Sequence, residues 1–105
     1  NDIVFNKNEI IIDAIFGYGL NRKTSGEFAK TIDGINNAKA KILSIDIPSG
    51  LFADDNRQNN GSIIRTDITY TFECMKFSFL LESNLPFFGQ VKLIDIGLEL
   101  QSKID

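Results

Sequence analysis

Two apolar runs, each broken by an aspartate, constrain most strongly what this chain can fold into. The first covers residues 9–16, where Asp13 interrupts the run and a glycine-rich stretch follows it. The second covers residues 41–47, where Asp46 stands directly before Ile-Pro-Ser-Gly. Runs that are apolar at nearly every position are typical of strands buried on both faces of a parallel sheet. Both runs are therefore predicted to be central strands of an α/β fold.

The segment between these runs predicts a helix over Gly26–Asn37. Phe28, Ile32 and Ile35 recur at spacings of four and three residues, and Thr24 or Ser25 precedes them as a candidate N-cap. An order of strand, helix and strand predicts a right-handed crossover between two parallel neighbours.

Two further strands are predicted over residues 67–72, which are rich in β-branched and aromatic side chains, and over residues 90–96, which alternate in polarity. The polar residues 52–61 predict an exposed loop. The apolar side chains between the last two strands are expected to cover the core: Phe77, Phe79, Leu80, Leu81, Phe87 and Phe88.

Composition limits the classes of protein to consider. The chain has 105 residues, of which 43% are hydrophobic and nine are phenylalanine, which is enough for the core of one domain or part of one. The net charge of −3 argues against a phosphate-backbone binder, so we expect no nucleic-acid partner. No apolar run approaches the roughly 20 residues that span a bilayer, so we expect no membrane partner and a cytoplasmic location.

The rare residue types limit the chemistry. The chain has no histidine, which excludes Ser-His-Asp and Cys-His mechanisms and His-ligated metals within it. Proton transfer must then use carboxylates, Lys, Tyr or water. The single Cys74 cannot form an internal disulfide and is expected to be a small buried side chain.

The carboxyl ends of neighbouring parallel strands border the crevice in which α/β proteins bind ligands. We therefore expect Asp13, the loop over residues 17–22, Asp46 and Ser49 to lie together. Each aspartate has an alternative role as a strand terminator, and Asp95 has the same ambiguity. The chain has no histidine, and Ser49 does not stand in a G-x-S-x-G elbow. A role as a ligand or in a turn is therefore favoured over a role as a nucleophile.

The glycine pair after the first strand has two interpretations. Gly17 and Gly19 stand where the first two glycines of a dinucleotide fingerprint stand, but Arg22 occupies the third position. The loop either binds a phosphate through backbone N–H groups and Arg22 or Lys23, or is a plain tight turn. Lys76 follows the third strand and either reaches a phosphate or is solvated.

In order along the chain, the sequence contains D-A-I-F-G-Y-G-L-N-R from Asp13, D-I-P-S-G-L from Asp46, D-I-T-Y-T-F from Asp67 with Lys76, and D-I-G-L from Asp95. This set resembles the YjeF N-terminal domain family, the NAD(P)HX epimerases, over residues 10–98. The resemblance implies a Rossmann-like three-layer α/β/α sandwich with a mostly parallel sheet, of which this chain covers part.

The resemblance also implies an activity. Family members interconvert the R and S hydrates of NADH and NADPH, and a dehydratase, sometimes fused to them, restores the reduced cofactor. By similarity Asp46 is catalytic and contacts the substrate, while Asp13 and Ser49 help to bind a potassium ion. The remaining substrate-binding residues would be Gly17, Tyr18, Gly19, Leu20, Asn21, Arg22 and Lys23. A homodimer is a further expectation from the resemblance.

The chain departs from the family pattern at Tyr18, where Thr or Ser is usual, and at Lys23, where Pro is usual. The family's upstream Asn-Asn-x-x-Asp segment does not occur in it. We therefore predict that residues 1–105 form the C-terminal portion of a single epimerase domain and are inactive alone. The alternative function is a nucleotide-binding or protein-interaction module of the same fold without catalysis.

Overall fold

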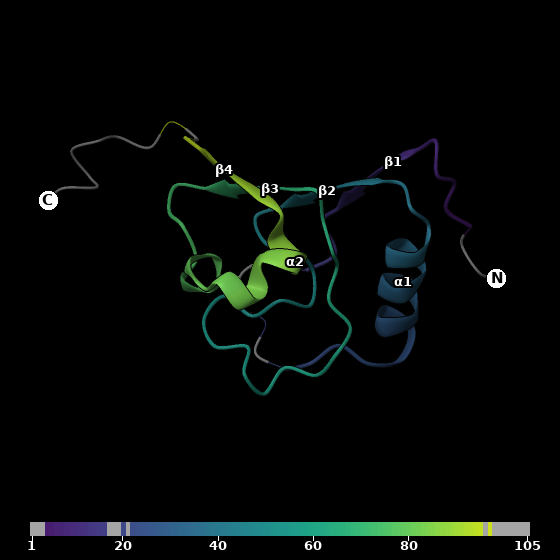
Figure 1. Cartoon of the computed structure of the whole chain (residues 1–105), viewed down its shortest axis with the longest axis horizontal. Helices are drawn as coiled ribbons and strands as arrows, with labels where there is room; N and C mark the ends of the chain where they lie inside the picture. Colours follow the sequence, from purple (N-terminus) through teal and green to yellow (C-terminus); the bar gives the residue numbers. More distant parts are fainter. Residues whose placement is uncertain (1–3, 17–19, 21, 96, 98–105) are drawn as a thin grey trace, which may run out of the picture.

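A four-stranded, all-parallel sheet forms the centre of the computed structural model, which describes residues 4–16, 20, 22–95 and 97. The strands are β1 (Ile10–Asp13), β2 (Lys41–Ile45), β3 (Ile68–Phe72) and β4 (Gln90–Ile94), and they lie in that order across the sheet (Figure 1). Helix α1 (Gly26–Asn37) connects β1 to β2. The predicted α/β class and the parallel sheet are confirmed, as are the predicted bounds of α1.

The connections after β2 are less regular. A long loop joins β2 to β3, and two short 3-10 helices, η1 (Phe77–Leu80) and η2 (Glu82–Asn84), precede the four-residue α2 (Leu85–Phe88) before β4. The four strands lie where the sequence predicts them, but three of them are shorter than predicted at the carboxyl end. The polar loop over residues 52–61 is held by two of its own side chains, since Asn56 accepts from the Phe52 N–H and Asn59 donates to the Gly50 carbonyl.

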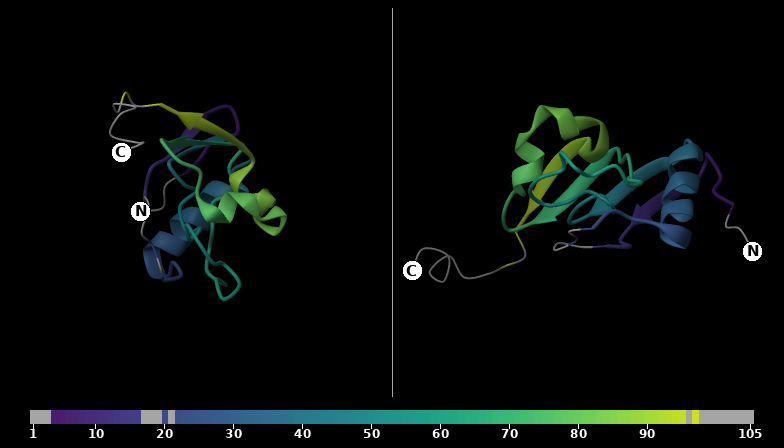
Figure 2. Two further views of the ribbon diagram at one scale, coloured as in Figure 1. Left: turned by 90° about the vertical axis from the view of Figure 1, so that its left-hand side faces the viewer. Right: turned by 90° about the horizontal axis from the view of Figure 1, so that it is seen from below.

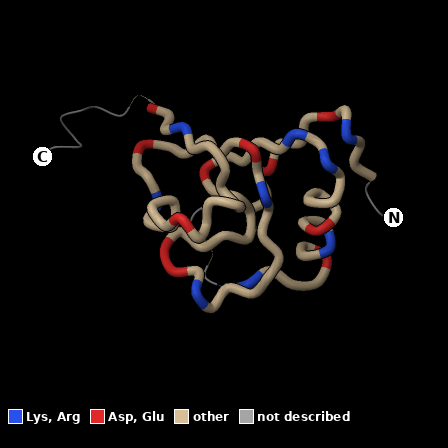
Figure 3. Tube along the Cα trace, viewed as in Figure 1, with Lys and Arg blue, Asp and Glu red and all other residues tan. Residues whose placement is uncertain are grey.

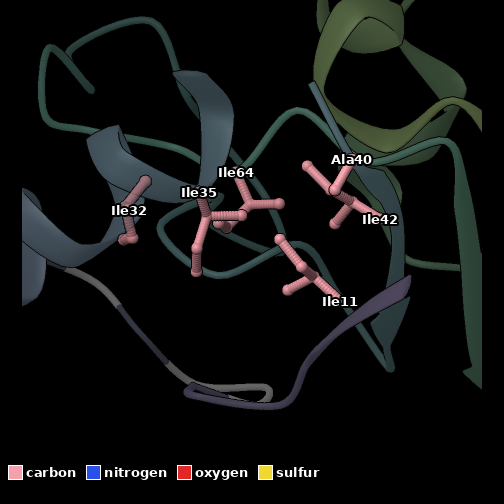
Figure 4. Close-up of a cluster of buried hydrophobic side chains, with 6 residues drawn as sticks. All are labelled: Ile11, Ile32, Ile35, Ala40, Ile42 and Ile64. Carbon is pink, nitrogen blue, oxygen red and sulfur yellow. The ribbon is translucent and has the colours of Figure 1, made fainter. Parts of the chain in front are cut away.

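All of the helices lie on one side of the sheet (Figures 1 and 2). Two clusters of buried apolar side chains fill the space between the sheet and these connections. One lies under α1 and contains Ile11, Ile32, Ile35, Ala40, Ile42 and Ile64 (Figure 4). The other lies under the later segments and contains Ile47, Leu51, Ala53, Ile63, Phe79 and Phe88.

The opposite face of the sheet is open at β1. Ile10 and Ile12 are 65% and 64% exposed, whereas Ile11 and Asp13, on the covered face, are buried. The expectation that residues 9–16 are buried on both faces is therefore wrong for the described chain, because none of its helices packs on that side. The described residues form two layers of the expected three-layer sandwich.

Three apolar or small side chains lie elsewhere than expected. Phe77 and Leu80 are exposed, whereas Ser78 and Phe79 between them are buried. In a 3-10 turn residues three apart share a side, so η1 directs Phe77 and Leu80 outward together. Cys74 is exposed and not buried, because it lies in the turn that leaves β3.

Lys and Arg are interspersed with Asp and Glu along the described trace (Figure 3). The longest helix described is the 12-residue α1, and none in the described ranges has the length and apolarity that a membrane crossing requires.

Candidate functional site

The carboxylate of Asp13 joins the carboxyl ends of β1 and β2. Asp13 is 1% exposed, and its register partner on β2 is Ser44, whose Oγ donates to Asp13 Oδ2 over 2.7 Å. Ser49 donates twice, from its N–H to Oδ2 at 2.8 Å and from its hydroxyl to Oδ1 at 2.5 Å. A buried carboxylate needs such donors because it has left water. The expected proximity of Asp13 and Ser49 is confirmed.

Ser49 extends this cluster to the chain that leaves β1. Its Oγ accepts a hydrogen bond from the Phe16 N–H at 2.9 Å, and the Ile15 N–H lies 3.4 Å from Asp13 Oδ1. The segment after β1 is thereby fastened to the Pro48–Gly50 turn after β2. Sequence reasoning did not include Ser44, although its place opposite Asp13 in two neighbouring strands was a usable signal.

A pocket of about 530 Å³ opens beside this cluster. Its lining comes from the end of the first strand segment, the following loop and the start of α1: Phe16, Leu20, Arg22, Lys23, Thr24, Ser25 and Phe28. Three predicted substrate-binding residues, Leu20, Arg22 and Lys23, thus line one pocket. The predicted binding residues Gly17, Tyr18, Gly19 and Asn21 lie outside the described residues.

Two features suit this pocket to an anion. Arg22 and Lys23 bring positive charge, and α1 begins at Gly26, so its first N–H groups lie at the pocket. Ser25 is the N-cap but makes no side-chain capping hydrogen bond in the described structure, so its hydroxyl does not occupy those N–H groups. The rings of Phe16 and Phe28, with centroids 5.0 Å apart, form an apolar wall.

The loop before α1 rests against residues 61–62. Thr24 donates from Oγ1 to the Ser62 carbonyl over 2.6 Å. A Cβ added to Gly61 would lie 2.6 Å from Lys23 Cβ and 3.0 Å from the Thr24 backbone N. Gly61 therefore permits an approach of two backbones that a larger residue would prevent, a constraint that sequence reasoning missed.

Asp46 lies at the same carboxyl end of the sheet but is held from the side of β3. Its φ of 72° is in the left-handed region, which aspartate tolerates better than most residues. The Asp46 N–H donates to the Tyr70 carbonyl over 2.6 Å, which fixes the backbone. The side chain forms an ion pair with Lys76, with 2.9 Å between Nζ and Oδ1.

Lys76 is the second charged residue of this site. It is 7% exposed, and its Nζ also donates to Thr71 Oγ1 over 2.8 Å. The alternative that Lys76 is simply solvated is wrong. Its position in an otherwise apolar stretch after β3 was a signal for burial, but the sequence did not identify its partner.

Comparison with protein families identifies the chain. Residues 1–78 match the model of the family described as YjeF-related protein N-terminus. The chain belongs to this YjeF-related N-terminal family. The resemblance inferred from the D-A-I-F-G and D-I-P-S-G-L motifs is thus confirmed.

Curated relatives of this family member agree. The chain is 39% identical over 88 residues to a protein of Oenococcus oeni and 40% identical over 94 residues to one of Lentilactobacillus buchneri, both named NAD(P)H-hydrate epimerase. These matches cover 84% and 90% of the chain but 41% and 43% of the relatives. It is also 41% identical over 90 residues to a Thermosynechococcus vestitus protein named bifunctional NAD(P)H-hydrate repair enzyme Nnr, covering 86% of the chain and 18% of that protein. The chain thus spans less than half the length of these relatives.

Proposed function

We propose that the protein containing this chain is an NAD(P)H-hydrate epimerase, which interconverts the R and S hydrates of NADH and NADPH. The observation that best supports the proposal is the position of the Asp46 carboxylate. In a member of this family, a partly exposed carboxylate paired with Lys76 lies at the carboxyl end of the sheet that also bears a basic pocket. Relatives that carry the name epimerase support the substrate class.

The proposed roles follow from the chemistry of each group. Arg22, Lys23 and the N-terminus of α1 bind the phosphates of the dinucleotide, since N–H groups and cations suit an oxyanion. Asp46 moves a proton at the hydrated nicotinamide ring. Inversion at the hydrated carbon breaks its C–O bond as the hydroxyl group takes a proton and leaves as water, and the bond re-forms when water adds to the other face and gives a proton back, with no net oxidation.

The proposal includes a potassium ion at Asp13 and Ser49. A carboxylate and a hydroxyl supply the oxygen ligands that hard cations take. Most acceptor positions of Asp13 already have close donors, but the Ile15 N–H at 3.4 Å is a long contact, so Oδ1 retains the capacity for a further ligand. The ligand types of Asp13 and Ser49 therefore fit a potassium ion. A cation there would supply fixed positive charge to orient substrate oxygens.

Three further parts of the proposal concern the whole protein. A dehydratase, separate or fused as in the bifunctional relatives, would use the epimerised hydrate. A homodimer and a cytoplasmic location accompany the epimerase assignment. Each of these rests on family resemblance.

The test is an epimerisation assay on the full-length protein that contains this chain. Loss of R-NADHX is followed with a coupled S-specific dehydratase, with and without potassium. We expect turnover in the wild-type protein, a gain with potassium, and a loss of at least about a hundredfold in Asp46→Asn, as is usual when a general acid or base is removed. Nucleotide binding without any turnover would instead favour the alternative of a non-catalytic binding module.

A matched control is available for Asp46→Asn. Asp54 is exposed in the polar loop, so Asp54→Asn removes the same charge from a surface position outside the strand ends. Near-normal epimerisation by Asp46→Asn would remove Asp46 from the mechanism while leaving the substrate class open to the wild-type result.

A further inference from the structure

The Lys76–Asp46 ion pair has an inner and an outer member. The side chain of Lys76 is 6% exposed and that of Asp46 is 20% exposed, so the carboxylate is the group that reaches the surface. A buried ammonium is costly unless its charge and its N–H donors are compensated. Of the two side chains, Asp46 is therefore the more accessible to a ligand.

The donors of Lys76 are directed at protein atoms. Nζ contacts Asp46 Oδ1 at 2.9 Å, Thr71 Oγ1 at 2.8 Å and the Cys74 carbonyl at 3.4 Å. Of the three N–H donors of an ammonium, the two short contacts engage two, and the contact with the Cys74 carbonyl is long. The burial of Lys76 and its ion pair with Asp46 argue against the phosphate-binding role considered from the sequence.

The contacts of Asp46 are one-sided. Among the described residues, both hydrogen bonds recorded for its carboxylate end on Oδ1, from Lys76 at 2.9 Å and from Thr71 at 3.4 Å. Lys76 and Thr71 are also hydrogen-bonded to each other, so Asp46 Oδ1, Lys76 Nζ and Thr71 Oγ1 form a closed triangle of contacts. The backbone of Asp46 is fixed independently by the Tyr70 carbonyl. Rotation of the carboxylate would break both contacts, and among the described residues neither recorded hydrogen bond ends on Oδ2.

We propose that Lys76 is a positioning residue for Asp46: it holds Oδ1, together with Thr71, so that Oδ2 faces the hydrated nicotinamide ring. Its charge compensates the carboxylate in a partly buried site, and this compensation persists while the proton moves at Oδ2. The inference rests on the proposed epimerase function and adds a residue that acts through Asp46 without touching the substrate.

The test compares four variants with the wild type in the full-length protein. Lys76→Met keeps the length of the side chain and removes its charge and donors. Asp46→Asn and the double variant of both positions complete a cycle, and Lys41→Met is the matched control because Lys41 is exposed at the opposite end of β2. The measured quantities are kcat and KM for R-NADHX epimerisation.

We expect Lys76→Met to lower kcat by about a hundredfold with KM changed less than about threefold, because misplacement of a catalytic group by an ångström has this effect. The double variant should be no slower than Asp46→Asn alone, since residues acting as a unit are not additive. Lys41→Met should match the wild type.

Three results would overturn the inference. Lys76→Met with a kcat within about threefold of the wild type would show that positioning is unnecessary, given the hundredfold loss expected from a misplaced group. A raised KM with unchanged kcat would indicate substrate binding instead. A double variant much slower than Asp46→Asn would show independent roles.

A second variant tests the proposal independently if Lys76→Met does not fold. Thr71→Val is nearly isosteric and β-branched, so it suits β3, and it removes the two contacts of Thr71 with Asp46 and Lys76. We expect about a tenfold lower kcat with KM unchanged, a smaller loss than the hundredfold of full misplacement. A kcat equal to that of the wild type would overturn the proposal.

A wild-type protein without turnover would refute the epimerase function, and this inference with it. An active wild type beside an unaffected Lys76→Met would remove this inference alone.

Discussion

The substitution Gly61→Ala tests whether the pocket before α1 depends on close backbone packing. An alanine Cβ would lie 2.6 Å from Lys23 Cβ, about 0.9 Å short of the ~3.5 Å at which carbon atoms make good contact. The nearest atoms belong to the Lys23–Thr24 backbone and to a Cβ, not to the end of a flexible side chain, so the loop itself must move. Gly61 has no left-handed φ, so backbone strain adds nothing to the effect.

The expected result has two parts. Overpacking should lower the free energy of unfolding by about 1–3 kcal/mol. Displacement of Lys23 by most of an ångström should raise KM for R-NADHX roughly tenfold, since catalysis and binding are sensitive to such shifts. Urea unfolding and epimerisation kinetics of the full-length protein measure the two quantities separately.

Gly34→Ala is the matched control for this experiment. Gly34 lies inside α1, and an added Cβ would have only ordinary contact with the Phe5 ring at 3.8 Å. The same substitution should there stabilise the protein by about 0.5–1 kcal/mol, because alanine favours helix, and leave KM unchanged. A Gly61→Ala protein with wild-type stability and wild-type KM would refute the reasoning.

Two other substitutions test the electrostatics of the fold. Asp13→Asn should destabilise the protein by about 2–3 kcal/mol in urea unfolding at fixed potassium concentration, because an amide turns a donor toward groups that now donate to Asp13, and a loss below about 0.5 kcal/mol would contradict this. Arg57 lowers the pKa of Asp55 from 3.8 to about 2 through hydrogen bonds and charge. This carboxylate therefore adds stability above pH 3.8 that is lost as the pH falls toward 2, and Arg57→Gln should return the pKa of Asp55 toward 3.8 in an NMR titration.

The sequence predicted the strands and α1 because their signals are local. Periodicity of Ile32 and Ile35 and the runs ending at Asp13 and Asp46 are visible without tertiary information. Exposure was harder to predict, since it depends on what packs against each face. The same run that indicates a strand buried on both faces leaves Ile12 exposed when only one face carries helices in the described chain.

The sequence predicted the part of the site that lies where β1 and β2 end. It did not predict the contacts that depend on the conformation of the loops and turns. Asp13 and Ser49 were placed together because parallel strands end at one edge. Lys76 could not be paired with Asp46 from the sequence, because the turn after β3 sets where the ammonium lies. Gly61 was missed for a similar reason, since its neighbour Lys23 is distant along the chain.

The order β1-β2-β3-β4 means that the chain crosses from each strand to the next in one direction, with its helices on one side (Figure 1). Right-handed connections that all run in one direction cover only one face of a sheet, which leaves the side bearing Ile10 and Ile12 open in the described chain. Winding reverses at a seam, and in doubly wound sheets ligands bind at that seam. β1 is an edge strand of the described sheet, so a strand wound the opposite way beside it would turn its end at Asp13 into such a seam.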